Sequence, residues 1–223
     1  MDSELYGRQV AILFIEKLLD GFEDAAALGQ FHTDLIRRVA GFSNFIENQA
    51  LLTRAKMLLQ TAPDKSFVYA LPSELDRRRS IPTKEEFEQE HPSFKDNDPI
   101  ELAQKISSND EGVSLCFEKK FSAAMKVARD DSAKEVVALT QAILGDCEGA
   151  IQSVQNEGLP QFRKINVLQI IALEFFRQGQ FERSDTLIKE IEAKYGYSSW
   201  DRLQLAIGFI GHNPWSYYPY PDW

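Results

Sequence analysis

The sequence has few of the residues that build metal sites, disulfide frameworks or membrane anchors. Among 223 residues only two are cysteine and three are histidine, and Cys116 and Cys147 stand 31 residues apart, outside any zinc-binding spacing. We therefore expect free thiols, no metal, and a reducing cytoplasmic setting. The longest apolar run near the start covers only residues 10–15, so we expect neither an export signal nor a membrane span.

Glycine, proline and positive charge are also scarce. With 12 glycines and 9 prolines, the chain is a poor candidate for a turn-rich all-β fold or a collagen-like repeat. Its 25 lysines and arginines face 34 acidic residues, and the net charge of -9 would repel a nucleic-acid backbone. The apolar share of 43% is typical of a folded globular chain, so we expect an all-α protein that does not bind nucleic acid.

Signatures of catalysis are missing as well. His32, His91 and His212 are scattered, and the chain has no HExxH, no GxSxG and no glycine-rich phosphate loop. A DxD pattern ends at Asp98, where Pro99 breaks the calcium-loop pattern, so Asp98 is expected to cap a helix. The sequence thus predicts no enzyme and no cofactor.

Apolar residues at helical spacing occupy most of the chain. They predict a helix from residue 3 to about residue 19, stopped by Gly21, and a longer helical stretch over 33–62 that is interrupted at Gly41. We expect these elements to form an N-terminal helical unit within residues 1–73.

A charged stretch follows over residues 74–98, where 13 of 25 side chains are charged. We expect an exposed connection with one short helix, started by a capping box of Thr83 and Glu86. Residues 77–79 are three arginines before Ser80, a pattern that resembles the substrate motif of basophilic serine kinases. Ser80 is therefore a candidate phosphorylation site, and a solvated basic run is the alternative.

The C-terminal half repeats with a period of 34 residues. Alanine recurs at that spacing, at Ala138, Ala172 and Ala206. Gly145 and Gly179 follow the same period, and 34 residues is the length of one helix-turn-helix unit. Residues of about 131–210 resemble the tetratricopeptide-repeat family, with the best copy at 165–196.

This resemblance implies antiparallel helical hairpins stacked into a right-handed superhelix. The helix that begins near Ser199 and ends before Pro214 would be the capping helix of the array. We accordingly predict a repeat domain over 99–213 and a separate tail over 214–223.

The resemblance also implies a concave groove, lined by the first helices of the hairpins, that holds a peptide or helix of a partner protein. The candidate groove residues are Lys134, Gln141, Gln169, Arg177 and Arg202. The alternative is that these side chains are simply solvated. The Lys and Asn clamp of chaperone-tail binders is absent, because its places are taken by Glu135, Leu139, Gln169 and Leu173.

The tail alternates aromatic residues with proline, and its aromatic members are Trp215, Tyr217, Tyr218, Tyr220 and Trp223. Proline favours an extended path that presents rings outward. The tail is expected to be a docking peptide, a plug in the protein's own groove, or a lid over the last repeat.

Taken together, these features predict a protein-binding adaptor, scaffold subunit or chaperone-like holder. The alternatives are an obligate structural subunit of a larger complex and, third, a small-ligand binder or enzyme that uses the concave pocket.

Overall fold

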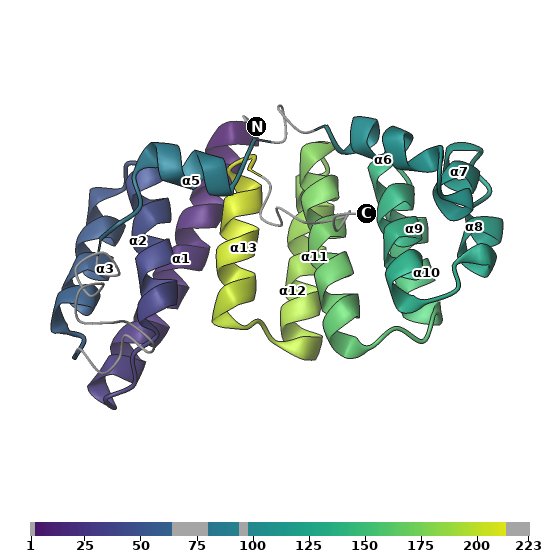
Figure 1. The fold of residues 1–223 in the computed structure, drawn as a ribbon. Helices are drawn as coiled ribbons and strands as arrows, with labels where there is room; N and C mark the ends of the chain where they lie inside the picture. Colours follow the sequence, from purple (N-terminus) through teal and green to yellow (C-terminus); the bar gives the residue numbers. More distant parts are fainter. Residues whose placement is uncertain (1–2, 64–79, 94–97, 213–223) are drawn as a thin grey trace. The chain divides into compact units, whose positions relative to one another are not determined.

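The structure, a computed structural model, describes residues 3–63, 80–93 and 98–212 (Figure 1). The described residues form the helices α1 (Ser3–Ala27), α2 (Thr33–Phe45), α3 (Gln49–Thr61), α5 (Lys84–Glu90), α6 (Pro99–Ser107), α7 (Glu111–Phe117), α8 (Phe121–Val127), α9 (Asp131–Ile143), α10 (Cys147–Asn156), α11 (Gln161–Arg177), α12 (Phe181–Tyr195) and α13 (Ser199–Phe209). The expected all-α class is confirmed over these residues. Among the described helices, none combines the length and apolar character that crossing a membrane requires.

The helices fall into two compact units. Unit 1 contains α1, α2, α3, α5 and α13, and unit 2 contains α6 to α12. The sequence assigned the last helix to the repeat array, whereas in the structure α13 belongs to unit 1 and packs along α1. The rings of Phe14 and Phe209 stack there with centroids 6.2 Å apart. Periodicity shows that a helix has an apolar face but not which face it meets, so the sequence misplaced this helix.

Helix α1 continues through Gly21, where the sequence predicted a stop. One glycine inside a helix costs only about 1 kcal/mol. Leu18, Leu19 and Phe22 are all buried on either side of it, and their packing outweighs that cost. The helix ends instead before Gly29, whose φ of +75° closes the last turn.

The stretch 33–62 is a hairpin of α2 and α3 whose break lies at Glu47 and not at Gly41. Glu47 adopts a φ of 56°, and Asn48 then caps α3 by accepting a hydrogen bond from the Leu51 amide. Gly41 serves packing: a Cβ at this position would come within 2.9 Å of Pro82 Cγ. Gly41 therefore makes room for Pro82 inside a helix, although in the sequence it looked like a residue that ends one.

The described part of the charged stretch contains the predicted short helix, and most of its side chains are exposed. Its helix α5 begins with the predicted capping box of Thr83 and Glu86. Phe87 of α5 is buried, and its ring lies 5.9 Å from Phe42 and 4.5 Å from Phe45, measured between centroids. One well-placed aromatic residue is enough to dock a short, highly charged helix on unit 1.

Unit 2 consists of α6 followed by three hairpins, α7–α8, α9–α10 and α11–α12 (Figure 1). The three turns share one geometry, with a left-handed residue at Lys119, Gly145 and Gly179. In each turn the amide of that residue and the amide of the next one return to carbonyls three and five residues earlier, which satisfies the end of the first helix. The hairpins are thus built from a repeated local motif.

The last two turns are 34 residues apart, as the repeat predicted, whereas the first lies 26 residues before Gly145. Its hairpin is short because α7 and α8 have only 7 residues each. The sequence did not reveal this hairpin, since its length breaks the period and Lys119 replaces the expected glycine.

Small residues lie where the helices of a hairpin cross. Ser184 of α12 is buried against α11, and its hydroxyl donates to the Ala172 carbonyl at 2.7 Å. Gln178 connects neighbouring hairpins, because its Nε2 donates to the Ala142 carbonyl of α9 at 3.2 Å. These contacts hold α9 to α12 in one stack.

Candidate functional site

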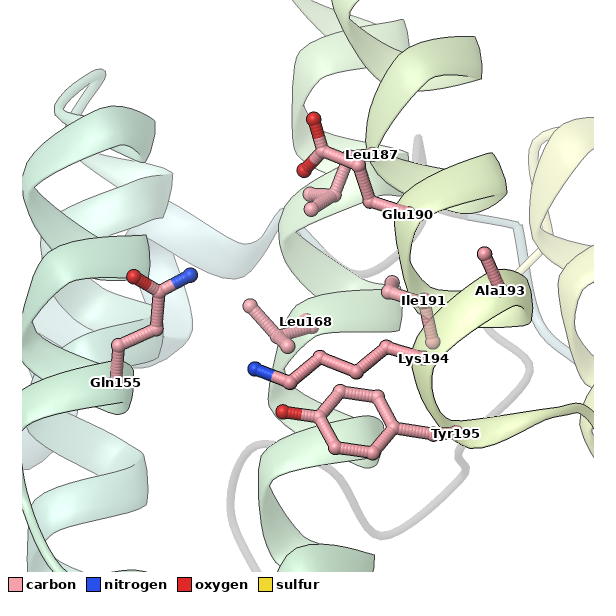
Figure 2. A pocket seen from close by; sticks show the side chains of 8 residues that line it. All are labelled: Gln155, Leu168, Leu187, Glu190, Ile191, Ala193, Lys194 and Tyr195. Carbon is pink, nitrogen blue, oxygen red and sulfur yellow. The ribbon is translucent and has the colours of Figure 1, made fainter.

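A groove of about 440 Å³ lies in unit 2 between α10 and α12, with α11 at its base (Figure 2). Its lining residues are Gln155 of α10, Leu168 of α11, and Leu187, Glu190, Ile191, Ala193, Lys194 and Tyr195 of α12. Figure 2 shows Lys194 and Tyr195 pointing from α12 toward the side where Gln155 stands, with Leu168 between them.

The groove arises because α10 and α12 differ in length. Near their first turns the two helices are joined by a bidentate ion pair. Arg183 Nε donates to Glu148 Oε1 at 2.5 Å, and Arg183 Nη2 donates to Glu148 Oε2 at 3.2 Å. From these aligned starts α10 extends over 10 residues and α12 over 15. The five extra residues of α12 span about 7.5 Å at 1.5 Å per residue. The last turn of α12 therefore extends beyond the end of α10, which contributes only Gln155 to the lining, and the base is left open.

The groove is apolar at its base and polar at its rim. Leu168, Leu187 and Ile191 are almost fully buried and form the base. The exposed side chains of Glu190 and Lys194 lie above them. The apolar base suits an aliphatic or aromatic side chain of a bound peptide. The polar rim suits the peptide backbone and the charged groups beside that side chain.

Charges at the rim are arranged with opposite signs along α12. The Glu190 carboxylate faces Arg183 at 3.5 Å, and the Lys194 ammonium lies 5.0 Å from the centroid of the Tyr195 ring. Arg183 also holds the pKa of the Glu148 carboxyl below its usual range, through their hydrogen bond. The ionised pair that aligns the two helices is therefore maintained at neutral pH.

Two of the predicted groove residues are used inside unit 2. Lys134 is half-buried and pairs with Glu157 at 2.8 Å, a hydrogen bond that raises the pKa of Lys134. Gln141 is buried; its Nε2 donates to Asp146 at 2.7 Å and its Oε1 accepts from Ser153 at 3.1 Å. Gln141 is thus part of the α9–α10 turn and is not presented to a partner.

The other three predicted groove residues lie on α11 and α13. Gln169 is only 1% exposed, and its Nε2 has no hydrogen-bond partner among the described residues. Arg177 pairs with Glu174 at 2.5 Å. Arg202 lies on α13, in unit 1. Gln141 and Gln169 are therefore buried, and Arg202 belongs to a different unit from the other four predicted residues.

The places of the absent chaperone-tail clamp are buried too. Glu135, Leu139, Gln169 and Leu173 are each at most 6% exposed. Arg163 of α11 reaches the Glu135 carboxylate at 3.1 Å. These four side chains are therefore almost fully covered in the structure.

Ser80 is exposed, and its carbonyl accepts a hydrogen bond from Arg37 Nε at 2.8 Å. The next residue, Ile81, lines a smaller pocket of about 220 Å³ together with Lys56, Leu59 and Gln60 of α3. Arg77 to Arg79 and the tail aromatics Trp215, Tyr217, Tyr218, Tyr220 and Trp223 lie outside the described residues.

The two cysteines are buried free thiols. Burial raises the pKa of Cys116 and of Cys147 to about 12, so neither is a nucleophile at neutral pH. Burial also raises the pKa of the Glu174 carboxyl, against the opposing effect of Arg177. Within residues 3–63, 80–93 and 98–212 no cluster of histidine, cysteine and acidic side chains could hold a metal ion.

Comparison with protein families, curated proteins and solved structures found no match for this chain.

One pattern in the sequence indicates the groove, although the 34-residue repeat does not reveal it. Leu187, Ile191 and Tyr195 recur at four-residue spacing, which marks one face of a helix. This apolar face of α12 continues for about one turn beyond the length of α10, which is the second helix of the preceding hairpin. The greater length of α12 is the feature that produces the groove.

Proposed function

We propose that this protein is a protein-interaction module, an adaptor or scaffold, whose groove between α10 and α12 binds a peptide or helix of a partner. The observation that carries the proposal is the apolar base beneath an exposed polar rim. The 34-residue period and the repeated hairpin turns support a tetratricopeptide-like array as its scaffold. A reducing cytoplasmic setting suits the free thiols Cys116 and Cys147.

The dimensions and chemistry of the groove suit a peptide side chain. Its volume of about 440 Å³ lies within the roughly 300–1,000 Å³ of ligand pockets. Leu187 and Ile191 lie four residues apart on α12. This spacing matches that of the apolar anchors at positions i and i+4 of a bound amphipathic helix. The two walls of the proposed groove come from the second helices α10 and α12, whereas the family resemblance implied a groove lined by first helices.

The test is to fill the groove without disturbing the core. Lys194 lines the groove, is exposed and points across it in Figure 2, so Lys194→Trp fills the groove with a bulky ring. Thr186→Trp is the matched control, since Thr186 is exposed on the same helix and does not line the groove. Full-length wild type and both variants would capture partners from cell lysate, with mass spectrometry and titration of the partner found.

We expect one partner to bind wild type and Thr186→Trp equally, and to bind Lys194→Trp at least about tenfold more weakly, a loss of about 1.4 kcal/mol. Circular dichroism would confirm that all three chains fold alike. Equal binding to all three would place recognition elsewhere, and repeated capture of no protein would contradict the interaction function.

A second candidate function is that of an obligate subunit, and it is favoured by apolar residues exposed in unit 1. Leu5 and Leu13 of α1 and Met57 of α3 are each more than 50% exposed. Such residues are usual at permanent interfaces. Self-association in analytical ultracentrifugation that Leu5→Ser with Leu13→Ser abolishes would favour this function.

A further inference from the structure

Two lysines stand at the end of the groove where α12 finishes. Lys194 of α12 lines the groove and is exposed, and its ammonium lies 5.0 Å from the centroid of the Tyr195 ring. Lys164 of α11 is half-buried one helical turn before Leu168, and its Nζ donates to the Gln155 carbonyl of α10 at 3.5 Å. Leu168 and Gln155 both line the groove, so Lys164 lies beside the lining, and Figure 2 shows Lys194 directed toward the same side.

The acidic residue on the groove rim already faces a cation, whereas the two lysines face no carboxylate. Glu190 lies 3.5 Å from Arg183. Among the residues that the structure describes, neither Lys164 nor Lys194 forms an ion pair with an acidic side chain. A chain with a net charge of -9 therefore carries unbalanced positive charge at this end of the groove. Because apolar walls concentrate the field of nearby charges, this end attracts a negatively charged ligand group.

Each lysine shares a helix face with a residue of the apolar base. Lys194 follows Ile191 by three residues on α12, and Lys164 precedes Leu168 by four on α11. A ligand whose apolar side chain occupies the base therefore brings its groups one turn further along to the lysines. In a helical ligand those groups stand three or four residues from the apolar anchor, on the same face.

We infer that the partner helix is acidic: its apolar anchors at i and i+4 occupy the base, and an aspartate or glutamate one turn beyond accepts hydrogen bonds from Lys164 and Lys194. This inference rests on the proposed function, since it names the partner chemistry of the same groove. Burial of the anchors supplies most of the affinity, and the lysines supply the selectivity. A basic helix would bring a third cation beside two that already lack a carboxylate, so it is rejected.

The first measurement selects phage-displayed random peptides on the immobilised full-length protein. Peptides that also bind the filled groove of Lys194→Trp are discarded. We expect the remaining sequences to combine two apolar residues at i and i+4 with an aspartate or glutamate one turn away. Remaining sequences without that acid would keep the groove as a binding site and overturn the acidic partner. A library that leaves no groove-dependent peptide would overturn the proposed function as well.

The second measurement titrates the tightest selected peptide, and its version with glutamine in place of the acid, by fluorescence anisotropy. Wild type should bind the glutamine version about threefold to tenfold more weakly, the range for two partly exposed ion pairs. The double variant Lys164→Gln with Lys194→Gln should bind both peptides equally. The matched control, Lys105→Gln with Lys126→Gln, removes two exposed lysines of unit 2 outside the groove and should keep the preference. No preference in wild type, or a preference that survives without Lys164 and Lys194, would overturn the inference.

Discussion

The turn between α7 and α8 forces a lysine into the left-handed conformation, so Lys119→Gly should stabilise the protein. Lys119 has a φ of 57° and is exposed. That conformation costs a residue with a Cβ about 1–2 kcal/mol. Glycine avoids this cost but loses about 0.5–1 kcal/mol more backbone entropy on folding. The net expected gain in the free energy of unfolding is about 0.5–1 kcal/mol.

Two matched variants separate turn geometry from a general effect of glycine. Lys120→Gly changes the next residue, whose φ of -95° is ordinary, and should lower stability by about 0.5 kcal/mol. Gly145→Ala, at a φ of +96° in the neighbouring turn, should lower it by about 1 kcal/mol. Urea unfolding followed by circular dichroism resolves these effects, because 0.5–1 kcal/mol moves the midpoint by about 0.4 M when m is near 2 kcal/mol/M. If Lys119→Gly proved no more stable than Lys120→Gly, a third hairpin turn at this position would be refuted.

Three further perturbations test the interior. A thiol reagent such as dithionitrobenzoate should leave Cys116 and Cys147 unmodified in the native protein at pH 8, because burial raises the pKa of both thiols to about 12. The same reagent should label both cysteines in urea. Rapid labelling without urea would contradict their burial. Burial raises the pKa of Glu174, so its ionisation opposes folding, and Glu174→Gln should be more stable than wild type at pH 7, with a difference that disappears as the pH falls below the ordinary value of 4.5; urea midpoints at pH 7 and pH 4 measure this, and a difference that grows in acid would reverse the sign. Phe87→Ala should destabilise unit 1 by about 3–5 kcal/mol in calorimetry if α5 is docked through this ring, and by under 1 kcal/mol if the segment is an exposed connection.

Local chemistry in the sequence predicted much of the helical structure. The capping box of Thr83 and Glu86 and the cap at Asp98 formed as expected, since each needs only residues within one helical turn. Gly145 and Gly179 mark turns for the same reason, because a left-handed residue ends a helix whatever lies around it.

Glycines inside helices were ambiguous in the sequence. Gly21 and Gly41 both looked like stops, yet α1 passes through the first and Pro82 packs on the second. Conversely, the true breaks at Glu47 and Lys119 carry no glycine. Whether a glycine ends a helix depends on what packs against it, and that is a tertiary property.

By itself the sequence determined the all-α class, the 34-residue period and the starts of the helices that follow Thr83 and Asp98, because caps, turns and periodicity act over a few residues. Only the tertiary structure decided that α13 packs along α1, and that Gln141 and Gln169 are buried. It also decided that the groove lies where α12 continues beyond α10. The pairing of apolar faces is set by shape and area between segments far apart in the chain, and a helical pattern specifies a face without naming its neighbour.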